Sequence, residues 1–153
     1  VKSQYPQVKF YLLGKYETAM QDAVDREYVQ QFIADGIIER FDETSDVRPF
    51  YSMSSVYVLP SYREGTPRTV LEAMAMGRPI ITTDTQGCRE TVLNGTNGFL
   101  VPVRNSEAIA EKMVWFINHP EKLSEMGKNS RQYAEEKFDV KKVNSDMMKT
   151  MRI

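Results

Sequence analysis

Two glutamates, Glu64 and Glu72, stand in an E-x7-E arrangement around a predicted helix start. Glu64 lies in a loop, and Gly65 beside it lets the backbone approach a ligand closely. We expect Thr66 to cap the helix and Pro67 to take its first position, so that the first amides point back into the loop. A helix carries about half a positive charge at its amino end. This end therefore suits a pyrophosphate.

Glu72 falls within that helix, among neighbours that are nearly all apolar. A carboxylate there is costly unless it has a partner, and ribose hydroxyls are one good partner. The alternative is that Glu72 faces solvent and pairs with Arg68, one helical turn earlier, while Glu64 is a simple turn residue. Spacing and chemistry alone favour this alternative, because two glutamates near a helix start are a weak signal.

Short apolar segments alternate with helical patterns along the chain. The expected strands are Val8–Leu13, Ile37–Phe41, Ser55–Leu59, Pro79–Thr82 and Phe99–Val103. The expected helices are Asp22–Ala34, Asp46–Met53 with an acidic cap, Thr66–Met76, Ser106–Asn118, Pro120–Lys137 and one from Val140 onward. This alternation predicts an α/β fold, with a Rossmann-like parallel sheet covered by helices on both faces. Such sheets bind ligands beyond the carboxyl ends of their strands, in the loops after Leu13, Phe41, Leu59 and Thr82.

The composition is that of an ordinary globular domain, and it argues against several classes of function. The 153 residues fit one domain, residues 1–153, and a net charge of −1 gives no strong field to attract nucleic acid. Cys88 is the only cysteine, so an internal disulfide is excluded and a reducing compartment is expected. No apolar run approaches the roughly 20 residues of a membrane helix. We also expect the abrupt start at Val1 to be a cut through a longer protein.

The run PSYREGTPRTVLEAMAMGRPIITTDTQGCRETVLNGTNGFLVP, which begins at Pro60, resembles the donor-binding region of family 4 glycosyltransferases. The upstream segment DVRPFYSMSSVYVLPS and the helical tail agree with it, so the resemblance covers essentially the whole chain. It implies the C-terminal half of a GT-B enzyme, a nucleotide-sugar-binding domain without the N-terminal acceptor domain and the start of its own domain. With this resemblance, the functional interpretation of Glu64 and Glu72 outweighs the alternative.

The resemblance also implies roles for individual residues. Glu64 would be the catalytic residue, holding hydroxyls of the transferred sugar beside the reacting carbon, and Glu72 would bind the ribose. The other donor-binding residues that it implies are Gly65, Thr66 and Pro67 against sugar and phosphate, Thr69 and Val70 with amides toward the pyrophosphate, and Arg40 and Phe41 by the base.

The chemistry that the resemblance implies is sugar transfer with retention of anomeric configuration, without a metal or other cofactor. UDP-hexose or UDP-N-acetylhexosamine would be the donor, and the sequence has no Asp-x-Asp motif or histidine cluster with metal-ligand spacing. A growing polysaccharide or lipid-linked glycan would be the acceptor, bound through the missing N-terminal domain. The location would be cytoplasmic, or peripheral on the inner membrane face in the full-length protein.

The family uses an Arg and a Lys from before this chain's start to neutralise the diphosphate, so we expect the chain alone to bind donor weakly and to be inactive. Two alternatives stay open. One is a sugar-nucleotide epimerase of GT-B architecture, against which the E-x7-E loop and helix argue. The other is a non-catalytic nucleotide-binding or scaffolding domain.

Other polar residues have structural explanations at least as good as functional ones. His119, at a helix end, is expected to contact the last carbonyls of that helix, and Cys88 to be an incidental thiol in a loop. Asp84 is expected on the ligand side of the sheet, where a loop cap is at least as good an explanation as ligand contact. For Arg89 and Glu90, a position facing the cleft and a surface salt bridge are equally good alternatives.

Overall fold

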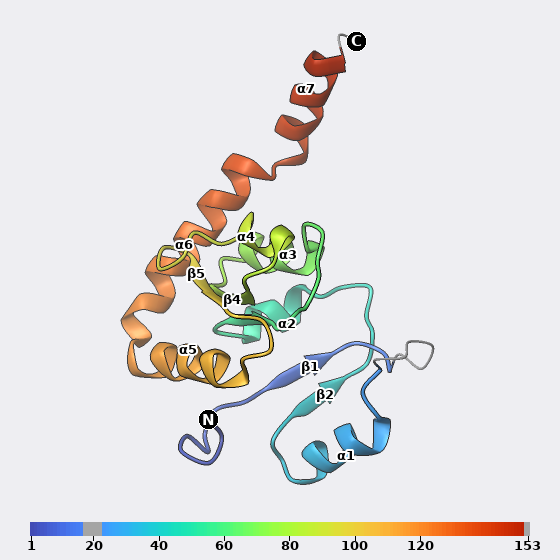
Figure 1. Cartoon of the computed structure of the whole chain (residues 1–153), viewed down its shortest axis with the longest axis vertical. Helices are drawn as coiled ribbons and strands as arrows, with labels where there is room; N and C mark the ends of the chain where they lie inside the picture. Colours follow the sequence, from blue (N-terminus) through green and yellow to red (C-terminus); the bar gives the residue numbers. More distant parts are fainter. Residues whose placement is uncertain (17–22, 152–153) are drawn as a thin grey trace. The chain divides into compact units, whose positions relative to one another are not determined.

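A computed structural model describes residues 1–16 and 23–151, and it shows an α/β protein (Figure 1). The chain forms two compact units, residues 1–50 and 51–153. Strands and helices alternate in both units, and neighbouring strands pair in parallel. The predicted fold class is therefore confirmed, whereas the prediction of a single domain over residues 1–153 stays a prediction.

The first unit is built on two parallel strands, β1 (Tyr11–Leu13) and β2 (Glu39–Phe41). They are connected through α1 (Arg26–Ala34), which begins after Asp25, whose side chain accepts a hydrogen bond from the Glu27 amide at 2.9 Å. The predicted start of this helix at Asp22 lies outside the described residues.

The second unit contains the strands β3 (Tyr57–Leu59), β4 (Ile80–Thr83) and β5 (Gly98–Val101), which pair in parallel with β4 in the centre. The connection from β3 to β4 contains α3 (Arg68–Ala75), and the connection from β4 to β5 contains the short helix α4 (Gln86–Arg89). The loops after β3 and β4 therefore lie at the same edge of this sheet.

The central strand β4 is buried on both faces. Ile81 packs with Val101, Phe116 and Met126 in one core cluster. Successive side chains of a strand point to opposite faces, so Ile80 lies on the other face, toward α3. Figure 1 shows α3 and α4 on one side of β4 and β5 and the next helix, α5, on the other side. Helices thus cover both faces of this sheet.

The chain ends in α5 (Ser106–Asn118), α6 (Pro120–Lys137) and α7 (Val140–Met151). The bounds predicted for α5 and α6 are confirmed. The side chain of Asn105 caps α5 by accepting a hydrogen bond from the Ala108 amide at 2.9 Å. None of the helices in the described part of the chain combines the length and apolar character needed to cross a membrane.

Several strands are shorter than predicted, because a strand extends only as far as its neighbour pairs with it. The prediction of a strand to Val103 is wrong: β5 ends at Val101, and Pro102 has no amide to donate to the ladder. At the start of β4, Pro79 contributes only its carbonyl, which accepts a hydrogen bond from the Tyr57 amide at 3.0 Å. The apolar patterns therefore located the strands but overestimated their length.

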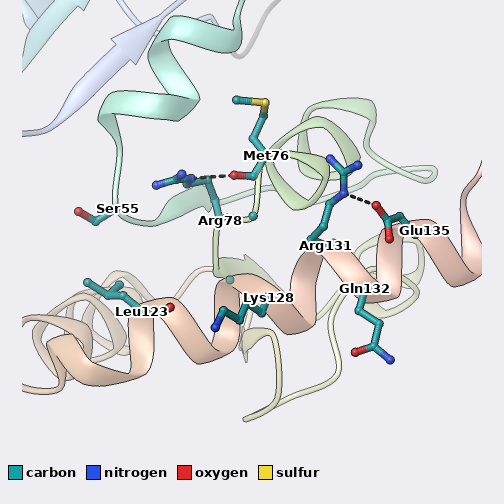
Figure 2. Close-up of a pocket in the computed structure, with 11 residues that line it drawn as sticks. Ser55, Met76, Arg78, Leu123, Lys128, Arg131, Gln132 and Glu135 are labelled. Carbon is teal, nitrogen blue, oxygen red and sulfur yellow. Dashed lines mark hydrogen bonds and ion pairs between the residues drawn. The ribbon is translucent and has the colours of Figure 1, made fainter.

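A hollow of about 690 Å³ lies beside the carboxyl end of α3, between that end and α6 (Figure 2). Three cations, Arg78, Lys128 and Arg131, are among its lining residues. Arg78 donates to the carbonyls of Met76 at 3.1 Å and Ser54 at 2.8 Å, and Arg131 donates to the Ala75 carbonyl. Arg131 and Arg78 therefore each bind a carbonyl at the carboxyl end of α3, and Arg78 also binds one in the segment before β3. The hollow lies where chain enters β3 and β4, away from the loops that leave them.

Candidate functional site

Glu64 lies half-buried in the loop of residues 60–67, which leaves β3 and leads into α3. The Ser61 hydroxyl lies 2.9 Å from Glu64 Oε1 and 3.2 Å from the Arg63 carbonyl, both of which can accept its proton. No ion pair in the described part of the chain includes Glu64. Its carboxylate is thus oriented by a neutral hydroxyl group.

The same loop is fastened to the end of β4. The Ser61 amide donates to Thr83 Oγ1 at 3.1 Å, and the Thr83 hydroxyl donates to the Ser61 carbonyl. Thr83 is only 3% exposed, because it belongs to the buried central strand β4. Packing therefore holds it in place. The position of Ser61, and through it that of Glu64, is set by the neighbouring strand.

Gly87 in α4 packs directly against the loop backbone. A Cβ atom built on Gly87 would lie 1.6 Å from the Gly65 carbonyl oxygen and 2.7 Å from the Glu64 carbonyl oxygen. Any side chain at Gly87 would therefore displace the loop that carries Glu64. Sequence reasoning missed this contact, and its only signal was a glycine after Thr85 and Gln86.

The prediction that Cys88 lies in a loop is wrong, because Cys88 belongs to α4 and is fully buried. Arg89 forms an ion pair with Asp84 at the surface. The surface salt bridge that was the alternative for Arg89 and Glu90 therefore forms for Arg89, with Asp84 as its partner.

The start of α3 differs from the prediction. Pro67 is the N-cap, with extended backbone angles and no side-chain hydrogen bond, and the helix begins at Arg68. Thr66 as cap and Pro67 as first helical residue are therefore wrong. The Pro67 carbonyl accepts from the Val70 amide at 3.1 Å, so Val70 uses its amide within the helix. The amides of Arg68 and Thr69 are the ones that a helix start leaves without an intrahelical acceptor.

Glu72 follows in the second turn of α3 and is half-buried. Its Oε2 lies 3.2 Å from the hydroxyl of Tyr51, which is also 2.9 Å from the Thr69 carbonyl. The alternative prediction, in which Glu72 pairs with Arg68, is wrong, because no ion pair among the described residues joins these two side chains. Tyr51 is a second residue that sequence reasoning missed, since its position fits an ordinary apolar helix face.

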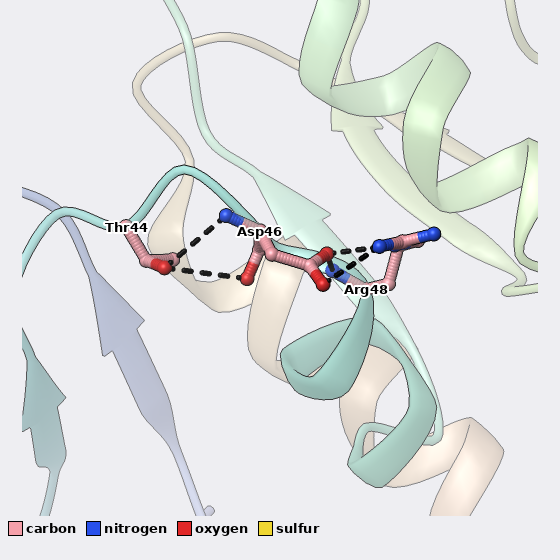
Figure 3. A network of polar contacts seen from close by, with 3 residues as sticks. All are labelled: Thr44, Asp46 and Arg48. Atoms are coloured by element: carbon pink, nitrogen blue, oxygen red, sulfur yellow. Dashed lines mark hydrogen bonds and ion pairs between the residues drawn. The ribbon is translucent and has the colours of Figure 1, made fainter.

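The helix that carries Tyr51, α2 (Arg48–Met53), begins in a polar network (Figure 3). Asp46 accepts from the Arg48 amide at 3.1 Å and from its guanidinium at 2.7 and 2.9 Å, which lowers the pKa of this carboxyl. Thr44 Oγ1 accepts from the Asp46 amide at 3.2 Å. The predicted acidic cap is confirmed, although the helix itself starts two residues after Asp46.

Arg40 and Phe41 belong to the first unit, at the end of β2. The Arg40 guanidinium donates to Asp42 and to the Gly14 carbonyl, each at 2.7 Å, and lies 4.0 Å from the centroid of the Tyr16 ring. The Phe41 ring contacts Phe50, with centroids 5.0 Å apart. Their proposed place by the base stays a prediction.

His119 has the structural role that was expected. Its Nδ1 lies 2.7 Å from the Trp115 carbonyl in the last turn of α5, and its ring stacks on the indole at 4.4 Å. Within residues 1–16 and 23–151, no group of three or more His, Cys, Asp and Glu side chains is arranged to hold a metal ion.

The family model for glycosyl transferases group 1 matches residues 1–119 of this chain. The chain is similar to the capsular polysaccharide biosynthesis glycosyltransferase CapM of Staphylococcus aureus, with 34% identity over 131 residues that cover 86% of this chain and 34% of CapM. It is also similar to an N,N'-diacetylbacillosaminyl-diphospho-undecaprenol alpha-1,3-N-acetylgalactosaminyltransferase of Campylobacter jejuni, with 31% identity over 68% of this chain and 28% of that protein.

Among solved structures, HepE of Anabaena in complex with UDP superposes with a TM-score of 0.87 and 26% identity, covering 96% of this chain and 41% of HepE. The chain spans about a third of the length of the curated relatives that it matches. The chain therefore belongs to the glycosyl transferases group 1 family and has the fold of the C-terminal domain of a family 4, GT-B glycosyltransferase.

Proposed function

We propose that this chain binds the nucleotide-sugar donor of a retaining glycosyltransferase. The observation that carries the proposal is the state of Glu64 and Glu72. Both are half-buried, both contact a hydroxyl group, and they lie on either side of the amino end of α3. Carboxylates held in this way can accept hydrogen bonds from the hydroxyls of a sugar and a ribose, while the amino end of the helix faces the diphosphate between them.

In this proposal Glu64 is the catalytic residue and contacts the transferred sugar, which is supported by its position in the loop at the carboxyl end of β3. Gly65, Thr66 and Pro67 lie against the sugar and phosphates, and the Thr69 amide faces the diphosphate. Preorganised positive groups must stabilise the departing diphosphate. The helix start supplies part of that charge, and we propose that cations outside this chain supply the rest.

The donor that we propose is UDP-hexose or UDP-N-acetylhexosamine, with no further cofactor. HepE binds UDP, and the Campylobacter jejuni relative transfers N-acetylgalactosamine, as their names state. We propose a polysaccharide or lipid-linked glycan as the acceptor, in line with the names of CapM and the Campylobacter jejuni protein. The predicted location, cytoplasmic or peripheral on the inner membrane face, stays a prediction.

Calorimetric titration of UDP and GDP into the full-length protein tests this proposal. Glu72→Ala should weaken UDP binding about ten- to hundredfold, the usual value of hydrogen bonds to a charged group. Glu111→Ala is the matched control, because Glu111 is an exposed glutamate in the middle of α5 and should leave UDP affinity unchanged. Failure of the unaltered protein to bind either nucleotide would favour a scaffolding domain instead.

A further inference from the structure

Tyr51 belongs to the second unit and is only 7% exposed. Its hydroxyl group lies beside α3, the helix that we propose to bind the donor. Its hydroxyl has two acceptors within reach, the Thr69 carbonyl at 2.9 Å and Glu72 Oε2 at 3.2 Å. Its ring packs edge-on against Tyr57, with centroids 5.6 Å apart. The ring is thus held by packing, which fixes the point from which the hydroxyl reaches Glu72.

The Tyr51 hydroxyl acts as a donor throughout the working range of pH. Burial, then the neighbouring Tyr57 and the negative charge of Glu72, raise the pKa of this phenol above its ordinary value. It therefore keeps its proton and presents a neutral donor to the carboxylate. Glu72 is thus oriented by a neutral hydroxyl group and not by an arginine or a lysine.

The contact leaves most of the carboxylate available. An ionised carboxylate has about four acceptor sites on two oxygens, and Tyr51 contacts only Oε2. In the described part of the chain, no cation forms an ion pair with Glu72. Oε1 and the remaining site on Oε2 can therefore accept from two neighbouring hydroxyls at once, provided that the carboxylate is held in one orientation.

We propose that Tyr51 is a positioning residue that fixes the Glu72 carboxylate for the two hydroxyls of the donor's ribose. This inference rests on the proposed function of Glu72. A purely structural alternative exists, since the bond to the Thr69 carbonyl alone would fasten α2 to the first turn of α3. The two roles differ in one respect: positioning requires Glu72, and fastening does not.

A double-mutant cycle on UDP affinity separates them, using Tyr51→Phe, Glu72→Ala and the combined variant in the full-length protein. Tyr51→Phe keeps the ring against Tyr57 and removes only the hydroxyl. It should weaken UDP binding about two- to tenfold in the unaltered background, the worth of one hydrogen bond. In the Glu72→Ala background, where position 72 has no side-chain acceptor, the same change should leave UDP affinity unaltered within error.

Tyr133→Phe is the matched control, because the Tyr133 hydroxyl donates to the Glu90 carbonyl at 3.1 Å and has no contact with Glu72. It should leave UDP affinity unchanged, and thermal unfolding of each variant reports on folding. An equal loss from Tyr51→Phe in both backgrounds, or no loss in either, would overturn the positioning role while Glu72→Ala still weakens binding. No effect of Glu72→Ala, or no UDP binding by the unaltered protein, would instead defeat the proposed function and this role with it.

Discussion

Glu64 and Glu72 are held by the hydroxyls of Ser61 and Tyr51. A glutamate with a purely structural role usually pairs with a cation or faces water. In neither case is its carboxylate held in an orientation that suits a ligand. These two are half-buried, and a neutral hydroxyl group contacts each of them. At the scale of the single residue, this is the arrangement that suits recognition of sugar hydroxyls.

Replacing Glu64 should separate turnover from nucleotide binding. In the full-length enzyme, we expect Glu64→Ala to lower kcat about a hundredfold or more, the usual cost of removing one group that stabilises a transition state. The Kd for UDP should change little, because Glu64 is proposed to contact the sugar and not the nucleotide. Steady-state kinetics and calorimetry on the same preparation measure both quantities.

Glu111→Ala again serves as the control for removing a glutamate from this chain, and it should alter neither kcat nor Kd. If Glu64→Ala reduces kcat and UDP affinity by the same factor, the role assigned to Glu64 is wrong.

At the scale of the element, the loop of residues 60–67 owes its position to two contacts from β4 and α4. Thr83 exchanges hydrogen bonds with Ser61, and Gly87 lies against the Gly65 carbonyl. Neither contact could be predicted from the local pattern, because each joins segments that are far apart in the sequence. The E-x7-E pair therefore identifies the candidate site, and distant contacts determine its geometry.

Two alanine substitutions in this region should both weaken donor binding but differ in their effect on stability. Gly87→Ala places a methyl group 1.6 Å from the Gly65 oxygen, so we expect a loss of about 1–3 kcal/mol in the free energy of unfolding and weaker UDP-sugar binding. Gly65→Ala meets no atom within 4 Å, so it should keep the melting temperature and weaken only donor binding. Thermal unfolding and calorimetry distinguish the two. An unchanged melting temperature for Gly87→Ala would contradict the close packing.

Helix ends show which parts of the elements a sequence can predict. The bounds of α5 and α6 follow from Asn105 as a cap and Pro120 as a first residue, which are local signals. Thr66 and Pro67 carry similar signals, yet α3 begins at Arg68, because the loop before it is drawn toward β4 and α4. At the start of α3, these tertiary contacts therefore override the local signals.

At the scale of the whole molecule, alternation of strands and helices was enough to predict the α/β class and parallel pairing. It could not place Arg40 and Phe41 relative to a base, because strand order within a sheet does not follow from periodicity. The chain also spans only about a third of the length of CapM. Activity of the full-length protein is therefore proposed from the site and the family.

A crystal structure of the full-length protein with an intact UDP-sugar tests the donor-binding role most directly. We predict a Glu72 carboxylate oxygen within hydrogen-bonding distance of a ribose hydroxyl, the diphosphate at the amino end of α3, and Glu64 against the sugar. A nucleotide bound elsewhere, for example in the hollow lined by Arg78, Lys128 and Arg131, with Glu64 and Glu72 facing only water, would contradict it.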